Sequence, residues 1–208
     1  MSADRRTLNR LATRQKISNV ATQLFQEKGF DQVTIDEIAR QAEVGRMTVF
    51  NHFPRKEDMF FEREDEGREI LRLALHLRDT SLDAVEALRR LAHHLVEQDS
   101  PLVSFSSASQ GFVSTIEKSE SLKARVRAIR DEFTHDLAQA LAVANGESAD
   151  NPKIFLTATL ILATWSSALI QGHHLFRQSQ NGPAATELFL KLIDDGFAGV
   201  QAAMHHSG

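Results

Sequence analysis

The chain of 208 residues contains no cysteine and no tyrosine. Without cysteine it cannot form a disulfide, a thiolate zinc site or a cysteine nucleophile, and a reducing cytosol is permitted. Glycine and proline are sparse, at 10 and 4 residues, which argues against a disordered or fibrous chain. Hydrophobic residues at 42% and charged residues at 25% are typical of a soluble globular protein of one or two domains.

Long apolar runs are also scarce. The opening "MSADRRTLNRLATRQK" is polar and basic, so we expect no secretory signal. The longest apolar stretch, residues 156–170, has fifteen residues including three Thr and two Ser, short of the ~20 that a spanning helix needs. We therefore expect a buried helix, no membrane segment and a cytoplasmic protein.

Strand-like alternation is absent and helical spacing of apolar residues recurs throughout, so we predict an all-α fold. There are no internal repeats. The expected helices, nine in all, lie at about 8–28 or 13–28, 35–41, 46–52, 55–79, 81–98, 102–115, 119–145, 151–178 and 184–205. Glycine or proline marks most of the breaks between them.

The first three helices form a helix-turn-helix pattern. Thr34 is a helix N-cap with Glu37 three residues on, a capping box. The second helix has an apolar face, the third has another, and the first helix supplies the element against which both can pack. These faces consist of Ile35, Ile38 and Ala39, of Val44, Val49 and Phe53, and of Ile17, Ala21, Leu24 and Phe25.

The outward face of the third helix suits a DNA major groove. Arg46 can reach guanine and Asn51 can reach adenine or a phosphate, while the surface contains two large apolar groups that favour a partner. The other contact candidates are Met47, Thr48, Phe50 and His52 on this helix, with Thr34 and Lys56 as phosphate contacts at helix starts. Each is otherwise an ordinary solvated residue.

The distribution of charge along the chain also favours DNA contact through the N-terminal part. Residues 1–56 carry ten basic and six acidic side chains, whereas the remainder carries fourteen and twenty-two. A basic end on an acidic body favours contact with a polyanion through that end, although so small an excess also arises by chance. The arm with Arg5, Arg6, Arg10 and Arg14 either follows the DNA backbone or enters the minor groove, or is an ordinary disordered tail.

The segment "GFDQVTIDEIARQAEVGRMTVFNHFPRKEDMF" resembles the DNA-binding signature of the TetR family of bacterial transcriptional regulators. The resemblance covers roughly residues 13–60 and departs at two positions. Glu43 stands where the family usually has Gly, a turn site that often needs a positive φ, so we expect a cost of about 1 kcal/mol unless Gly45 relaxes the turn. Phe50 stands where the family usually has Tyr, whose hydroxyl commonly binds a phosphate, so binding then depends more on Thr48, His52 and Lys56.

The last two expected helices are apolar on more than one face. Such helices must be covered on every face, which indicates a four-helix dimer interface, as the resemblance also implies; the alternative is that both are central helices of a larger bundle. The expected interface residues are Phe155, Leu156, Leu160, Leu188, Leu192, Phe197 and Val200.

In the family the middle helices enclose a ligand cavity. The candidates here are Phe105, Phe112, Phe133 and Trp165, with His93 or Gln110 as a polar contact. Each is otherwise ordinary core. No charged residue interrupts an apolar face, which weakly favours an apolar ligand.

Other functions are less well supported by the residues. The chain lacks a glycine-rich phosphate loop, Gly-x-Ser-x-Gly and His-Glu-x-x-His, and its adjacent histidine pairs chelate poorly on a helix, so we expect no enzyme, metal or cofactor. A helical interaction protein that keeps the helix-turn-helix as scaffold is a second alternative. We therefore expect a DNA-binding domain at 1–56 and a ligand-binding and dimerisation domain at 57–208. We expect the protein to bind a palindromic operator, and helix 55–79 to act as the lever by which effector binding releases it.

Overall fold

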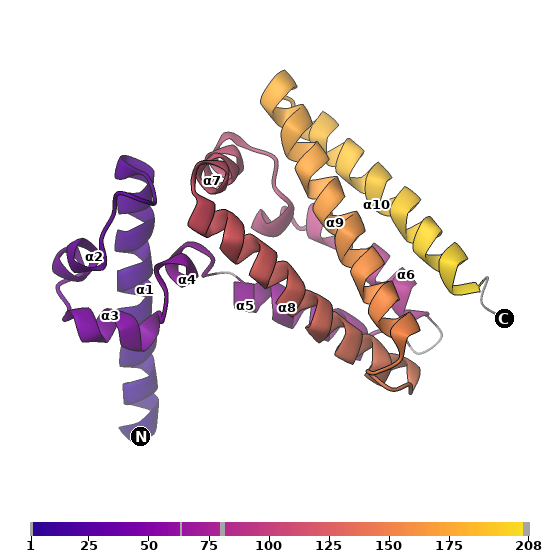
Figure 1. Cartoon of the computed structure of the whole chain (residues 1–208), viewed down its shortest axis with the longest axis horizontal. Coiled ribbons are helices and arrows are strands. Elements are labelled where there is room, and N and C mark those ends of the chain that lie inside the picture. Colours follow the sequence, from indigo (N-terminus) through magenta and orange to yellow (C-terminus); the bar gives the residue numbers. More distant parts are fainter. Residues whose placement is uncertain (1, 63, 80–81, 206–208) are drawn as a thin grey trace. The chain divides into compact units, whose positions relative to one another are not determined.

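The computed structural model describes residues 2–62, 64–79 and 82–205, and within these ranges it contains helices and no strand. The all-α prediction is therefore confirmed (Figure 1). The elements are α1 (Ser2–Lys28), α2 (Ile35–Gln41), α3 (Arg46–His52), α4 (Lys56–Phe60), α5 (Glu64–His76), α6 (Ala84–Glu97), a 3₁₀ turn η1 (Pro101–Val103), α7 (Ser107–Lys118), α8 (Glu120–Asn145), α9 (Pro152–Ser179) and α10 (Gly182–His205).

The prediction of one helix over residues 55–79 was wrong. Helix α4 ends at Phe60, and the following Phe61 has φ −100° and ψ 34°, outside the helical region. The rings of Phe60 and Phe61 meet edge to face at 5.1 Å, and both pack against the core of the N-terminal helices. No proline or glycine stands at this break, because tertiary packing rather than local propensity ends the helix.

Two other helix boundaries differ from the expectation. Helix α1 begins at Ser2, earlier than residue 8 or 13. The expected helix at 102–115 is divided into η1 and α7. Ser106 separates them, because its Oγ accepts a hydrogen bond from the Ser109 N–H at 3.3 Å at the start of α7.

The chain forms two compact units, each with its own core. Unit 1 comprises residues 1–64 and 115–125, and unit 2 comprises residues 65–114 and 126–208. The expected division between residues 56 and 57 falls inside unit 1, where Met59 is fully buried in the core. No sequence pattern indicates that residues 115–125 belong to this unit.

The core of unit 1 follows the predicted apolar faces. Helices α2, α3 and α4 surround the C-terminal half of α1 (Figure 1). The side chains of Ile17, Ala21, Leu24, Ile38, Val49 and Phe53 are inaccessible to solvent, and Phe25 and Ala39 are nearly so. Ile35 and Val44 are only partly buried at the edge of this core.

Residues 115–125, the end of α7 and the start of α8, complete unit 1. Leu122 is fully buried among the residues of the unit 1 core. Next to it, Ser119 Oγ donates a hydrogen bond to Asp31 Oδ1 at 2.7 Å. Arg125 Nε lies 3.4 Å from Asp58 Oδ1 of α4. One apolar side chain and two polar contacts therefore hold this segment in the unit.

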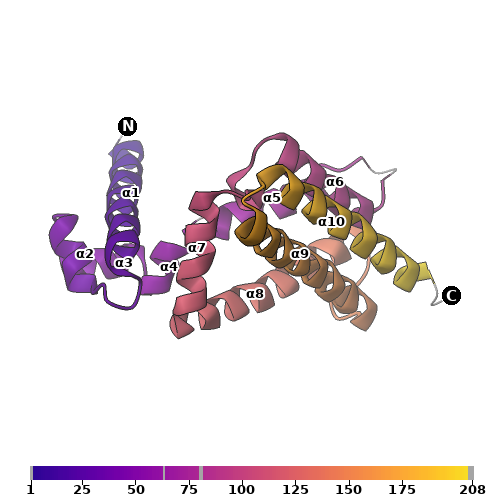
Figure 2. The ribbon, with the colours of Figure 1, turned by 90° about the horizontal axis from the view of Figure 1, so that it is seen from above.

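In unit 2, α9 and α10 lie side by side along most of their length (Figures 1 and 2). The predicted stripe on α10 is buried, with Phe189, Ile193, Phe197 and Val200 at 3% exposure or less. The helices approach closely at Gly196, where an added Cβ would collide with the side chain of Thr164. Gly172 of α9 similarly leaves room for the ring of Phe105.

Helix α9 extends beyond the apolar run at residues 156–170 on both sides. Over its whole length it is long and apolar enough to cross a membrane, by length and composition only. Core helices of soluble proteins can have the same length and composition. In the structure, Ile154, Ala158 and Ile161 of α9 are buried in the core of unit 2.

Candidate nucleic-acid interface

Helix α2 begins at the predicted cap. Thr34 Oγ1 accepts a hydrogen bond from the Glu37 N–H at 3.2 Å. The side chain of Glu37 does not complete the reciprocal capping box and instead pairs with Lys28 Nζ, a hydrogen bond that lowers the pKa of this carboxyl. Thr34 itself is exposed, so its place at the helix start leaves it available to a ligand.

The turn between α2 and α3 contains the strained residue expected from the sequence. Glu43 has φ +53°, a left-handed conformation that costs a non-glycine residue about 1 kcal/mol. Gly45, with φ −72°, does not relieve it. Glu43 Oε2 accepts a hydrogen bond from Lys16 Nζ at 2.6 Å, but both side chains are exposed and such pairs contribute little.

Helix α3 presents one face to solvent and one to the core. Val49, together with Phe53 just after the helix, is fully buried and fixes its orientation. Arg46, Met47 and Asn51 are exposed, while Thr48, Phe50 and His52 are partly buried. Met47 is 69% exposed, so its apolar side chain is open to a partner at this surface.

Arg46 is held in place by two neighbours. Its Nη1 lies 3.0 Å from both Oδ1 and Oδ2 of Asp36, at the start of α2. Its Cζ lies 5.6 Å from the centroid of the Phe50 ring, within cation–π range. Sequence reasoning missed Asp36, because no helical spacing rule connects residues ten positions apart across a turn.

Arg14 is engaged inside unit 1. Its Nη1 donates a hydrogen bond to the carbonyl oxygen of His52 at 2.6 Å, and its Cζ lies 4.1 Å from the centroid of the Phe53 ring. Arg14 thus ties α1 to the end of α3. Burial, followed by the charges of Arg10 and Arg14, lowers the pKa of His52, which favours the neutral imidazole. The side chains of Arg5 and Arg6 lie outside the described ones.

Lys56 is also turned inward. Its Nζ donates hydrogen bonds to the carbonyl oxygens of Phe30 at 2.8 Å and Val33 at 2.9 Å. It lies 4.2 Å from the centroid of the Phe30 ring. Partial burial lowers the pKa of the ammonium group, which the charges of Asp31 and Glu57 oppose. The neighbouring Arg55, not anticipated from the sequence, is the exposed cation here.

The predicted ligand-binding residues do not gather in one place. Phe105 and Trp165 each pack against Phe189, with ring centroids 5.8 and 5.9 Å apart. Phe112 is 43% exposed. The centroid of the Phe133 ring lies 4.7 Å from Cζ of Arg68.

The two residues predicted as polar ligand contacts, His93 and Gln110, lie in different surroundings. His93 Nε2 lies 2.8 Å from Asp194 Oδ1 of α10, in an ion-pair network at the surface of unit 2. Gln110 Oε1 is buried without a hydrogen-bond partner among the described residues. Gln110 therefore fits the predicted role of polar ligand contact better than His93 does.

A cavity of about 120 Å³ lies elsewhere in unit 2, between α6, α8, α9 and α10. Its lining includes Asp83, Leu141, Thr157, Gln201 and Met204, and none of the predicted ligand residues. Among the described residues, no group of three or more histidine, aspartate or glutamate side chains is placed to hold a metal ion.

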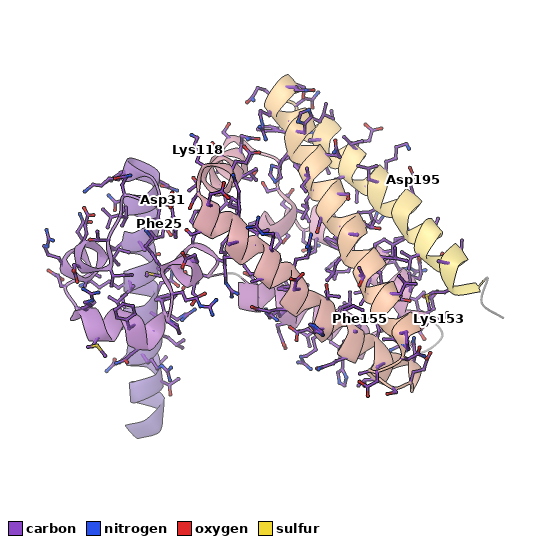
Figure 3. All side chains as sticks on the ribbon, viewed as in Figure 1. Phe25, Asp31, Lys118, Lys153, Phe155 and Asp195 are labelled. Atoms are coloured by element: carbon purple, nitrogen blue, oxygen red, sulfur yellow. The ribbon has the colours of Figure 1, made fainter. Side chains whose placement is uncertain are left out.

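The predicted dimer residues divide into two groups. Phe155, labelled near the beginning of α9 in Figure 3, is 42% exposed. Leu156 next to it in the sequence is 54% exposed, and Leu160, Leu188 and Leu192 are partly buried. Phe197 and Val200 were wrongly placed on the interface, because they are buried in the core of unit 2. Ile170, which the prediction omitted, is 63% exposed on α9.

The N-terminal geometry is that of a helix-turn-helix DNA-binding domain, and comparison with known proteins gives its family. Residues 17–62 match the family model of the bacterial regulatory proteins of the tetR family. The curated HTH-type transcriptional regulator SAB2452 of Staphylococcus aureus is 33% identical over 51 residues. That match covers 24% of this chain and 28% of the relative.

Solved structures resemble the chain over most of its length. NalD of Pseudomonas aeruginosa, described as the secondary repressor of the MexAB-OprM multidrug efflux pump, is 19% identical with a TM-score of 0.57, covering 90% of this chain and 97% of that one. FadR of Thermus thermophilus, a TetR-family repressor in complex with lauroyl-CoA, is 19% identical with a TM-score of 0.53, covering 90% and 93%. SmeT in complex with triclosan is 19% identical with a TM-score of 0.54, covering 90% and 91%.

At these identities the structural likeness establishes the fold. The family model and the curated relative assign the N-terminal domain. Residues 17–62 are thus similar to the DNA-binding domain of the tetR family, and the whole chain shares its all-helical fold with these solved structures.

Proposed function

We propose that this protein is a cytoplasmic transcriptional repressor that binds a palindromic operator as a homodimer and is released by a small, largely apolar effector. The observation that supports this most directly is the exposed surface of α3. Arg46, Met47 and Asn51 face solvent on a helix whose other side is fixed by the buried Val49 and Phe53. A rigid helix with a cation, an amide and an apolar group on its open face suits the major groove.

Phosphate contacts would surround this helix. Thr34 at the start of α2 and Arg55 beside α4 are exposed, and Thr48, Phe50 and His52 border the recognition surface. Lys56 would act indirectly, since its ammonium group holds the segment before α2 through the carbonyl oxygens of Phe30 and Val33. Arg14 would likewise support α3 from behind through the His52 carbonyl.

Effector release requires a connection between the two units. The chain passes between them after residue 64, after residue 114 and after residue 125. The lever expected at 55–79 is interrupted after Phe60. We therefore place the coupling in the segment 115–125, where Leu122 enters the core of unit 1 and Ser119 bonds to Asp31. An effector that favours one arrangement of α7 and α8 would shift the population of DNA-binding geometries.

Unit 2 contains the residues that we expect to bind the effector and to form the dimer. The buried Gln110 Oε1, which has no hydrogen-bond partner among the described residues, suits a ligand that carries a hydrogen-bond donor. Two structures of similar fold, SmeT and FadR, are complexes with triclosan and with lauroyl-CoA. The exposed apolar residues of α9 suit a two-fold interface.

The test is a gel-shift titration on a genomic fragment enriched by the parent protein. Arg46→Glu should abolish selective binding, and binding by the parent should weaken steeply with salt. Arg130→Glu makes the same charge change at an exposed site in unit 2 and should bind as the parent does. Equal binding by the parent and Arg46→Glu would refute the proposal.

A further inference from the structure

Arg46 is fixed through only one of its three nitrogens. Nη1 is 3.0 Å from both carboxylate oxygens of Asp36, whereas Nε and Nη2 have no partner among the described residues. The N–H groups of Nε and Nη2 lie parallel on one side of the planar guanidinium. This free side is the pair of donors that matches the two acceptors O6 and N7 of a guanine.

The ring of Phe50 restricts the same group from another direction, with its centroid 5.6 Å from Cζ. Asp36 lies on α2, and Arg46 and Phe50 lie on α3. The guanidinium is therefore held by residues from both helices of the motif. An arginine held in this way loses less conformational freedom when it binds a base than a freely rotating one would.

Stability does not account for the Asp36–Arg46 pair. The two side chains are each 60% exposed, and exposed pairs contribute little to folding. The carboxylate also has an electrostatic effect on the DNA-facing surface. It neutralises Arg46 in the free protein and opposes capture of that side chain by any phosphate, which is the interaction that supplies sequence-independent binding.

We propose that Asp36 is a specificity-determining residue, which positions Arg46 to read one guanine in each half-site and suppresses binding to unrelated DNA. This inference rests on the proposed function, because it assumes that α3 enters the major groove. It assigns a DNA-recognition role to a residue whose negative charge would, on charge alone, weaken contact with DNA. Asp36 acts through Arg46 and is a positioning residue.

The experiment is selection from a pool of randomised DNA duplex, followed by titration of the enriched duplex and of random duplex at several salt concentrations. For Asp36→Asn we expect the preference for guanine at one half-site position to fall about tenfold. Affinity for random duplex should rise about twofold to fivefold, and the slope of log K against log salt should steepen by about 0.9. The guanine preference and the affinity for random duplex thus move in opposite directions.

Three variants serve as controls. Asp36→Glu keeps the charge and should keep both the low random-duplex affinity and most of the guanine preference. Glu27→Gln removes one negative charge from an exposed site on α1 of the same unit and should leave the base preference unchanged. In an Arg46→Ala background, Asp36→Asn should have no further effect on the guanine preference, because both changes remove the same interaction.

The outcomes separate the inference from the proposed function. If the parent enriches no sequence, the proposed function fails. If the parent enriches a sequence and Asp36→Asn shows the same base preference and random-duplex affinity, the inference is overturned. If Asp36→Asn instead lowers the melting temperature and weakens all duplexes equally, Asp36 is only structural, which also overturns it.

Discussion

At the scale of single residues, the cations of unit 1 divide into those that support the fold and those that face solvent. Lys56 donates to two backbone carbonyl oxygens, and Arg14 donates to a third. Arg46 and Arg55 remain exposed. Side-chain type and motif position predicted all of these except Arg55 as DNA contacts. Motif position fixes where a side chain starts, whereas its hydrogen-bond partners depend on the packed backbone nearby.

We expect Lys56→Met to destabilise the protein by about 1–3 kcal/mol. The substitution removes the donor to the carbonyl oxygens of Phe30 and Val33. The Val33 carbonyl loses this partner, and the Phe30 carbonyl keeps only the longer hydrogen bond from the Val33 N–H at 3.3 Å. Arg55→Met, at the adjacent exposed position, should change stability by less than about 0.5 kcal/mol. Chemical denaturation of both variants checks this. Equal stability of Lys56→Met and the parent would show that the inward hydrogen bonds contribute nothing.

We expect Phe50→Tyr to tighten DNA binding or leave it unchanged. The tyrosine ring preserves the packing against Arg46, which lies 5.6 Å from the Phe50 centroid. The added hydroxyl could bind a phosphate, as the resemblance to the family implies. Gel-shift titration is the measurement, and clearly weaker binding by Phe50→Tyr would contradict the prediction.

At the scale of helices, apolar spacing predicted the faces well and the ends less well. The stripe of Phe189, Ile193 and Phe197 is buried as expected, because periodicity reports which side of a helix meets the core. The break after Phe60 was not predictable, since aromatic packing produces it without a local stop signal. Nor was the place of Leu122 in unit 1, because an apolar residue in a helical pattern does not specify which core it enters.

Gly196 is a helix position at which a single added carbon would meet a neighbouring helix. We expect Gly196→Ala to destabilise the protein by about 1–3 kcal/mol, since the new Cβ would collide with Thr164 where α10 packs on α9. Gly111→Ala is the control, because a Cβ there meets nothing within 4 Å. That change should be neutral or stabilise by up to about 1 kcal/mol. Thermal melting that shows the same sign for both variants would contradict this account of the helix contact.

An ion-pair network joins α6 to α10 in unit 2. Arg89 Nε donates to Glu86 Oε2 at 2.7 Å, and Arg89 Nη1 donates to Asp194 Oδ1 at 2.7 Å. Hydrogen bonds from Arg89, and secondarily from Arg90, lower the pKa of Glu86 from 4.5 to about 2. A carboxylate with a lowered pKa stabilises the fold above its unfolded pKa and loses that contribution as pH falls.

We therefore expect the stability contributed by Glu86 to be constant above about pH 5 and to disappear between pH 4.5 and pH 2. Its size should be about 1–2 kcal/mol, because partial exposure of its partners reduces the full linkage value. The measurement is the difference in unfolding free energy between the parent and Glu86→Gln as a function of pH. A difference that does not shrink on acidification would contradict the assigned cause.

At the scale of the whole molecule, the proposed function requires two copies of the chain. A single α3 can contact one half-site, whereas a palindrome is read by two recognition helices related by a two-fold axis. The exposed apolar residues of α9, Leu156 and Ile170 at 54% and 63%, are the side chains we expect to become buried between the two copies.

We expect Leu156→Glu combined with Ile170→Glu to convert a dimer into a monomer while the helical circular dichroism is retained. Burying two carboxylates in an apolar interface is costly, but both sites are open in the single chain. Val143→Glu is the control, since Val143 of α8 is 84% exposed and lies outside α9 and α10. Light scattering coupled to size exclusion measures the mass. A double variant that remains dimeric would place the interface elsewhere.

The most direct test of the account is to sequence the genomic fragments that the purified protein retains at near-physiological ionic strength, with and without added apolar metabolites. The account predicts enrichment of a two-fold-symmetric sequence whose half-site centres lie about one helical turn of DNA apart, or a multiple of it. The same selection with Arg46→Glu should lose that sequence. Retention of random and genomic fragments in equal proportion by the parent protein would contradict the account.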